Sequence, residues 1–266
     1  EDKSTTLAKA LGAKGLLNIQ SAIKDDTLFI LEANPRASRT MPFVSKVTGN
    51  QIIKAGTLLM LGHSLDSIKK TTNYLNSSTN KVAIKKAIFP WSRFPAEDTM
   101  LGPEMKATGE VLGIGRSFGV ALNKAYAAAG VEINENEKGI FVSLSDQEKP
   151  NFIKIVKTYS DLGFKIYSTY GTGEYLKNNK INSTIVGRAD ETFPTSLTIL
   201  QDKLISLVIN TPTFANEYTD GWKIRRLSHE TGVAVVSSVR EAEAFLKAFL
   251  ETTKSFEDME AIQNVS

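Results

Sequence analysis

Residues 139–173 read GIFVSLSDQEKPNFIKIVKTYSDLGFKIYSTYGTG, and this stretch decides the fold of the C-terminal half of the chain. The apolar run Ile140–Val142 predicts a buried strand, and Phe164–Ser168 predicts a second one. Apolar residues recur between them at helical spacing, which predicts a helix that ends at Gly163. This apolar face consists of Phe152, Ile155, Val156, Tyr159 and Leu162. Two strands joined by such a helix form a parallel pair.

The same alternation of strand and helix continues to residue 250. Two capping boxes, Ser145–Glu148 and Ser238–Glu241, are expected to begin helices, because each places a Ser and a Glu where they can bond free N–H groups. A short helix is expected to begin at Gly173–Lys177. The remaining strands are predicted at Thr184–Val186, Leu204–Ile209 and Val233–Val236. The pattern predicts an α/β fold with a parallel sheet covered on both faces.

The first half of the chain has a different pattern. Two strands, Leu16–Ile23 and Thr27–Leu31, are expected to form a hairpin around the polar residues between them. Residues 134–138 (NENEK) are polar, have no apolar periodicity and are the best linker candidate. We therefore predict one domain over residues 1–133, a second over residues 138–250, and a polar tail over residues 251–266.

Composition excludes several classes of function. The 266 residues include 41% hydrophobic and 23% charged residues, which is typical of a globular protein, and no apolar run is long enough to suggest a membrane span. The net charge of +3 is small and scattered, so nucleic acid is not an expected partner. The absence of cysteine excludes disulfides, zinc-thiolate sites and thiol catalysis. No targeting peptide is visible at the start, which predicts a cytoplasmic protein, or a mitochondrial one if the N-terminus is truncated.

The segment Leu31–Arg39 (LEANPRASR) carries the densest polar chemistry of the first half. Alternate residues of an extended strand share a face, so Glu32, Asn34 and Arg36 are expected to point the same way. If the hairpin is centred on Asp26, Gln20 lies directly opposite Glu32.

This set predicts a site for a metal ion and phosphate. The oxygen atoms of Gln20, Glu32 and Asn34 suit Mg²⁺ better than a soft metal. The guanidinium groups of Arg36 and Arg39 would then meet phosphoryl oxygens. An edge strand with exposed polar side chains is the alternative interpretation.

A second group of polar residues follows the ends of the predicted parallel strands. Ligands of open parallel sheets bind outside these ends, and the helices that follow offer free N–H groups to an anion. Lys149 adds a positive charge at a helix start. The strand ends are Ser143, Ser168–Gly173, Gly187–Arg188 and Asn210–Thr213. The group predicts a pocket for a phosphate or carboxylate, with ordinary turn and capping chemistry as the alternative.

Several motifs resemble one family. Leu31–Gly49 (LEANPRASRTMPFVSKVTG) is similar to the last catalytic stretch of the ATP-grasp domains in the large subunit of carbamoyl-phosphate synthetases. Val82–Phe94, Leu101–Met105 and Thr108–Val111 resemble further signatures of these enzymes, and the resemblance runs over nearly the whole chain. It implies the C-terminal portion of the second ATP-grasp domain, followed by a Rossmann-like, methylglyoxal-synthase-like regulatory domain.

The resemblance also implies an activity. The family consists of ATP-dependent ligases that make carbamoyl phosphate from bicarbonate, ammonia or glutamine, and two ATP, for pyrimidine or arginine synthesis. It implies Gln20, Glu32 and Asn34 as ligands of ATP phosphates and of Mg²⁺ or Mn²⁺, with Arg36 and Arg39 as catalytic residues. The implied partners are the rest of the large subunit and a glutaminase subunit or domain. Because the glycine-rich phosphate loop and its lysines are missing, this fragment alone is expected to make no carbamoyl phosphate.

The resemblance implies an allosteric role for the second domain. The residues that match the family's effector contacts are Ser143, Lys149, Thr169, Thr172, Asn210 and Thr211, with Arg188 in place of a lysine that meets a phosphate. Ornithine-activated relatives have carboxylates where this chain has Lys86 and Val235–Ser237. We therefore expect an anionic effector, preferably phosphorylated, rather than ornithine.

Two alternatives are a stand-alone effector-binding module and a lyase of the methylglyoxal-synthase kind, although no catalytic Asp and His flank the phosphate turn. The segment near residue 225 has two further features. Arg225 and Arg226 resemble the family's helix start, and either pack across a domain interface or are exposed charges. His229 is expected on the helix surface.

Overall fold

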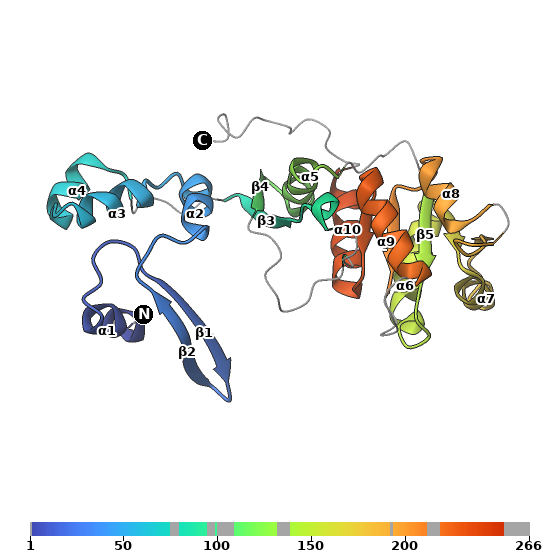
Figure 1. Ribbon diagram of the computed structural model, residues 1–266, viewed down its shortest axis with the longest axis horizontal. Helices are drawn as coiled ribbons and strands as arrows, with labels where there is room; N and C mark the ends of the chain where they lie inside the picture. The colour runs from blue at the N-terminus through green and yellow to red at the C-terminus, as the bar shows by residue number, and fades with distance from the viewer. Residues whose placement is uncertain are drawn as a thin grey trace. The chain divides into compact units, whose positions relative to one another are not determined.

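The computed structural model describes residues 2–74, 80–94, 99, 109–131, 139–191, 194–211 and 219–252 (Figure 1). The described residues form two compact units, which divide between Lys81 and Val82. The predicted linker at residues 134–138 lies outside the described residues, so the domain boundary placed there stays a prediction. The mixed α/β fold class expected from the sequence is confirmed.

The first unit contains an antiparallel hairpin and four short helices. Strands β1 (Asn18–Lys24) and β2 (Thr27–Asn34) are joined by Asp25 and Asp26, whose φ angles are 49° and 55°. Two successive positive φ angles are typical of the tight hairpin turn that matches strand twist, which explains why two aspartates suffice here. The helices are α1 (Asp2–Ala10), α2 (Thr40–Thr48), α3 (Ile52–Met60) and α4 (Leu65–Thr71).

The second unit begins with an antiparallel pair and a covering helix. Strand β3 (Val82–Ile88) pairs with β4 (Gly109–Gly115), and α5 (Phe118–Ala128) follows. The helix lies so close to β4 that a Cβ atom on Gly113 would collide with the backbone of α5. A short 3₁₀ turn, η1 (Trp91–Arg93), follows β3.

A five-stranded parallel sheet forms the rest of the second unit, in the order β7-β6-β5-β8-β9. The chain enters at the central strand β5, moves outward to β7, returns to β8 beside β5, and ends at β9. The strands are β5 (Gly139–Ser143), β6 (Lys165–Ser168), β7 (Thr184–Ile185), β8 (Leu207–Asn210) and β9 (Ala234–Val236). The order therefore reverses between β5 and β8, which is where open α/β sheets bind ligands.

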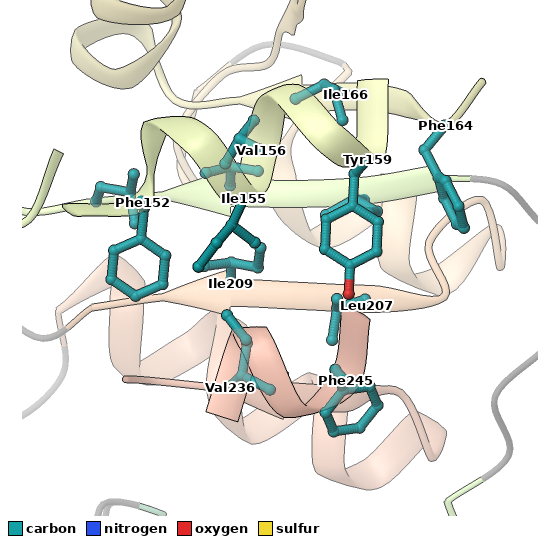
Figure 2. Packing of buried hydrophobic residues seen from close by; sticks show 14 of the residues in the cluster. Phe152, Ile155, Val156, Tyr159, Phe164, Ile166, Leu207, Ile209, Val236 and Phe245 are labelled. Carbon is teal, nitrogen blue, oxygen red and sulfur yellow. The ribbon is translucent and has the colours of Figure 1, made fainter. Parts of the chain in front are cut away.

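Helices cover both faces of this sheet, as the sequence predicted. They are α6 (Lys149–Asp161), α7 (Tyr170–Asn178), α8 (Ser196–Gln201), α9 (Asp220–Thr231) and α10 (Val239–Thr252). Successive residues of a strand face opposite sides, so Ile140 and Val142 join one core cluster whereas Phe141 joins the other. Figure 2 shows the first cluster, in which side chains of α6 such as Ile155 lie over those of β8 such as Ile209.

The two predicted capping boxes have different outcomes. At the start of α10, the backbone N–H of Glu241 donates to Ser238 Oγ at 3.3 Å, which confirms the Ser238 cap, whereas the Glu241 carboxylate accepts the N–H of Ser237 at 3.0 Å instead of that of Ser238. The box at Ser145–Glu148 is wrong. Helix α6 begins only at Lys149, and its N-cap residue Glu148 makes no side-chain cap bond.

The helix expected to begin near Gly173 also starts earlier. Strand β6 ends at Ser168, Thr169 is the N-cap residue, and α7 begins at Tyr170. Gly171 and Gly173 therefore lie in the first turn of a helix rather than in an open glycine-rich loop. This shift brings the helix N-terminus directly onto the end of β6.

Candidate effector site and ATP-binding segment

The ends of β5 and β8 are joined by hydrogen bonds that use both backbone and side chains. Ser143 pairs with Asn210 in the sheet register, and the N–H of Thr211 donates to the Ser143 carbonyl at 3.1 Å. Thr211 Oγ1 in turn accepts the N–H of Ser145 at 2.8 Å. This bond occupies the Ser145 N–H that Glu148 would accept in a capping box, and Ser145 Oγ also accepts from Thr211 Oγ1 at 3.4 Å, so Ser145 is held at the end of β8 instead.

The end of β6 adds two threonines. Thr172 is 1% exposed, and its Oγ1 accepts the N–H of Leu144 at 3.1 Å and the hydroxyl of Thr169 at 3.2 Å. Thr169 makes no side-chain cap bond to α7. The first turn of α7 therefore presents its N–H groups, with the positive end of the helix dipole, beside the end of β5.

Lys149 lies beside this helix turn. A Cβ atom placed on Gly171 would stand 3.7 Å from Lys149 Nζ, so the ammonium group lies within van der Waals distance of this turn. Nζ lies 2.5 Å from Asp146 Oδ1 and 5.9 Å from the centre of the Tyr175 ring. The Lys149 side chain is 12% exposed and that of Asp146 is 92% exposed, so a solvent-facing carboxylate covers a largely buried cation. The bond from Lys149 and its charge lower the pKa of Asp146.

Six of the seven predicted effector residues thus meet at neighbouring strand ends. We call them the strand-end site, and they are Ser143, Lys149, Thr169, Thr172, Asn210 and Thr211. Within the described part of the chain, no hydrogen bond joins Arg188 to them. It is exposed, follows the edge strand β7, and its backbone N–H donates to the Glu191 carboxylate at 2.9 Å.

Sequence reasoning missed one residue of this region. Arg225 on α9 is 5% exposed, and its Nη1 donates to Asn210 Oδ1 at 2.7 Å. The neighbouring Arg226 is 8% exposed and donates to the Phe94 carbonyl at 2.8 Å. The interpretation of both as exposed charges is therefore wrong. A signal was available, because Gly221 lies one turn before Arg225 and leaves room for a close approach.

The prediction that His229 lies on the helix surface is also wrong. Its ring packs on Trp91, with ring centres 5.9 Å apart, and Trp91 is 8% exposed. Burial, together with the charges of Lys86, Arg226 and Arg225, lowers the pKa of His229 to about 4. The residue belongs to the packing between α9 and the turn after β3, not to the helix surface.

Lys86 is held inside the second unit. Its Nζ lies 4.2 Å from the centre of the Tyr126 ring. Burial lowers the pKa of Lys86, and the charge of Glu241 opposes that effect. The ammonium group of Lys86 therefore already places a positive charge at this position of β3.

The hairpin residues that were predicted to bind a metal ion keep the expected pairing between the two strands. Gln20 lies directly opposite Glu32, as expected, and Asn34 Nδ2 donates to Glu32 Oε1 at 2.9 Å. The turn is centred between Asp25 and Asp26 and not on Asp26, and a register shift between Ser21, which pairs with Ile30, and Gln20 brings Gln20 opposite Glu32. Glu32 and Asn34 therefore share a face of β2.

The two arginines lie beyond this strand. Strand β2 ends at Asn34, and the N–H of Arg36 turns back to the Asn34 carbonyl at 2.8 Å. The expectation that strand alternation extends to Arg36 is wrong, because the chain bends at Pro35. Arg36 Nη1 donates weakly to the Ala37 carbonyl at 3.4 Å, and Arg39 is the N-cap residue of α2.

The donor atoms at the hairpin decide how well a magnesium ion would fit there. Within the described ranges no group of three or more His, Cys, Asp or Glu side chains could hold a metal ion. The set at the hairpin offers one carboxylate and two amides. With Asn34 Nδ2 turned to Glu32, the Asn34 Oδ1 atom is left for a cation. These donors fit part of a magnesium shell, and the other ligands would come from nucleotide, water or other protein groups.

The hairpin region and the parallel-sheet region both resemble parts of known proteins. Residues 1–68 match the family model "Carbamoyl-phosphate synthase L chain, ATP binding domain", and residues 151–237 match the "MGS-like domain". The carbamoyl phosphate synthase large chain, C-terminal section, of Aquifex aeolicus is 36% identical over 97% of this chain and 50% of its own length. The corresponding section in Methanocaldococcus jannaschii is 37% identical over 96% of this chain and 42% of its own length. The chain belongs to the carbamoyl phosphate synthase large-chain family.

The family's domain order agrees with the sequence interpretation. The end of an ATP-binding domain precedes an MGS-like domain, and strands β6 to β9 of the parallel sheet lie within the MGS-like match, with β5 just before it. The large chain of Brucella suis is 40% identical over 93% of this chain but only 22% of its own length. The chain thus spans half or less of these carbamoyl phosphate synthase relatives. In the described parts, no helix has the length and apolar character needed to cross a bilayer.

Proposed function

We propose that the parallel-sheet domain of this chain binds an anionic, phosphorylated effector at the strand-end site. One observation carries the proposal: the Lys149 ammonium lies against the first turn of α7, which is bonded to Leu144 just after β5, one of the two strands between which the strand order reverses. A half-buried cation and a helix N-terminus both favour negative charge, and backbone and hydroxyl donors lie beside them.

The charge pattern favours an anion over ornithine. Asp146 is the carboxylate bonded to Lys149, and its side chain is nearly fully exposed, so an incoming anion can displace it. At the other position where a cationic effector would need a carboxylate, Lys86 Nζ lies over the Tyr126 ring. A second cation there would meet like charge.

We propose further that the first unit contributes to the ATP site that phosphorylates carbamate in the whole enzyme. Mg²⁺ or Mn²⁺ bound there would neutralise charge on the ATP phosphates. Gln20, Glu32 and Asn34 would hold the ion and the nucleotide through their oxygen atoms. The exposed Arg36 and Arg39 side chains, just past the strand, would orient the phosphoryl group and balance its charge.

The ligase activity is proposed for the full protein only. Glu32 is a single carboxylate, and the hairpin set lacks lysines for the nucleotide phosphates, so the chain alone is expected to be inactive. The rest of the large chain would complete the ATP site, and a glutaminase subunit or domain would supply ammonia. The product, carbamoyl phosphate, would then serve pyrimidine or arginine synthesis.

Isothermal titration calorimetry tests the effector proposal. UMP, UTP, phosphoribosyl pyrophosphate, N-acetylglutamate and ornithine are titrated into the chain and into the variants Thr169→Ala, Arg188→Ala and Lys149→Met. Lys154→Met is the matched control, because Lys154 is an exposed lysine of the same helix. We expect one phosphorylated ligand to bind, Lys149→Met to weaken it by about tenfold or more, and the control to leave it unchanged. Binding of ornithine, or equal loss in both lysine variants, would contradict the proposal.

A further inference from the structure

The pair formed by Arg225 and Asn210 is buried at the strand-end site. Arg225 is 5% exposed and Asn210 is 3% exposed, and Nη1 lies 2.7 Å from Oδ1. A guanidinium group is rarely buried unless it is well bonded, because it loses its hydration. The chain therefore keeps a charged group inside the domain, directly behind the end of β8.

The backbone of α9 is shaped for this contact. A Cβ atom on Gly221 would lie 3.1 Å from Arg225 Nη1 and 3.4 Å from Asn210 Oδ1. A larger residue would push against both partners at once. The absence of a side chain at this position thus leaves the space in which the two groups meet.

The contact decides which way the Asn210 amide faces. Since Oδ1 accepts from Arg225, the amide must present Nδ2 on its other side. There Nδ2 lies 3.5 Å from the Ser143 carbonyl, a long and weak contact. Nδ2 therefore remains a donor at the end of β8, beside the end of β5 where the strand order reverses.

We propose that Arg225 is a positioning residue of the strand-end site, which holds the Asn210 amide so that Nδ2 donates to the bound anion. The inference rests on the proposed effector function. Without Arg225 the amide could rotate and turn its oxygen toward the ligand, and an oxygen atom repels an anion. The positive charge of Arg225 also polarises the amide and increases the donor strength of Nδ2.

The neighbouring Arg226 provides a matched control. It is also buried, on the same helix, but its Nη1 donates to the Phe94 carbonyl at 2.8 Å and its Nε to Glu230 at 2.9 Å. A general effect of removing a buried arginine from α9 should appear in both variants. An effect on the anion site should appear only when Arg225 is changed.

The test measures UMP and inorganic phosphate binding by calorimetry to Arg225→Gln, Arg226→Gln, Asn210→Ala and the double variant of residues 210 and 225. We expect about tenfold weaker binding for Arg225→Gln and less than about twofold change for Arg226→Gln. If Arg225 acts through Asn210, the double variant binds no more weakly than Asn210→Ala. Additive losses, or equal loss in both arginine variants, would overturn the inference.

Nuclear magnetic resonance on the unaltered chain keeps the inference testable if Arg225→Gln does not fold. The Asn210 side-chain amide signal is identified by its loss in Asn210→Ala. It should shift as UMP or phosphate is added, because Nδ2 bonds the ligand. Binding without a shift of this signal overturns the inference but leaves the effector function standing, whereas no binding of any probe to the unaltered chain overturns both.

Discussion

Lys149 Nζ lies 2.5 Å from Asp146 Oδ1, so the cation of the strand-end site already has an anionic partner. The partner is only three residues away in sequence and nearly fully exposed. A bound phosphate and this carboxylate would compete for the same ammonium group.

Asp146→Asn should therefore strengthen anion binding. Exposed ion pairs contribute little free energy, so we expect a gain in UMP affinity of about two- to fivefold. Asp161→Asn is the control, because Asp161 pairs with Lys157 at 3.2 Å on the same helix but away from the strand ends. Calorimetry at two salt concentrations measures the effect. Weaker binding in Asp146→Asn would mean that the carboxylate orients Lys149 instead of competing with the ligand.

His229 should make the stability of the second unit depend on pH. The pKa of His229 is lowered from 6.5 to about 4 in the folded chain. Between these two pH values, the unfolded chain binds a proton at His229 and the folded chain does not. Stability from this residue is complete above about pH 6.5 and falls as the pH drops toward 4, by at most about 3 kcal/mol. Urea unfolding between pH 7 and pH 4 measures the loss.

The variant His229→Gln should flatten this pH dependence, because glutamine cannot be protonated. His63→Gln should not, since His63 is exposed in the first unit. An unchanged pH profile in His229→Gln would show that other groups dominate the acid response.

Phe152 should contribute strongly to the stability of the parallel-sheet domain. It is 0% exposed in the cluster between α6, the sheet and α10. Phe152→Ala should lower the free energy of unfolding by about 3–5 kcal/mol, because it removes apolar contacts and leaves a cavity. Phe29→Ala, at a 49% exposed position of β2, should cost much less. Chemical unfolding followed by circular dichroism compares the two, and equal costs would contradict the packing described here.

Local sequence patterns were sufficient for much of the architecture. The apolar runs of β5 and β8 and the helical spacing in α6 predict a covered parallel sheet, because strand and helix periods differ and burial selects apolar residues. The pairing of Gln20 with Glu32 was predicted from a hairpin centred on Asp26, but the turn is centred between Asp25 and Asp26, and only the bulge between Gln20 and Ser21 brings Gln20 opposite Glu32. The cap at Ser238 was predicted because its partner Glu241 lies within one helical turn.

Only the tertiary structure decided which side chains meet across elements far apart in sequence. The cap at Ser145 fails because its N–H is bonded to Thr211, which lies on another strand end. His229 is covered because the turn containing Trp91 packs on α9. Arg225 reaches Asn210 because the sheet places β8 beneath that helix. The sequence pattern of a helix shows which of its faces is apolar. Which residues lie against that face follows from strand order and packing, which bring distant residues within bonding distance.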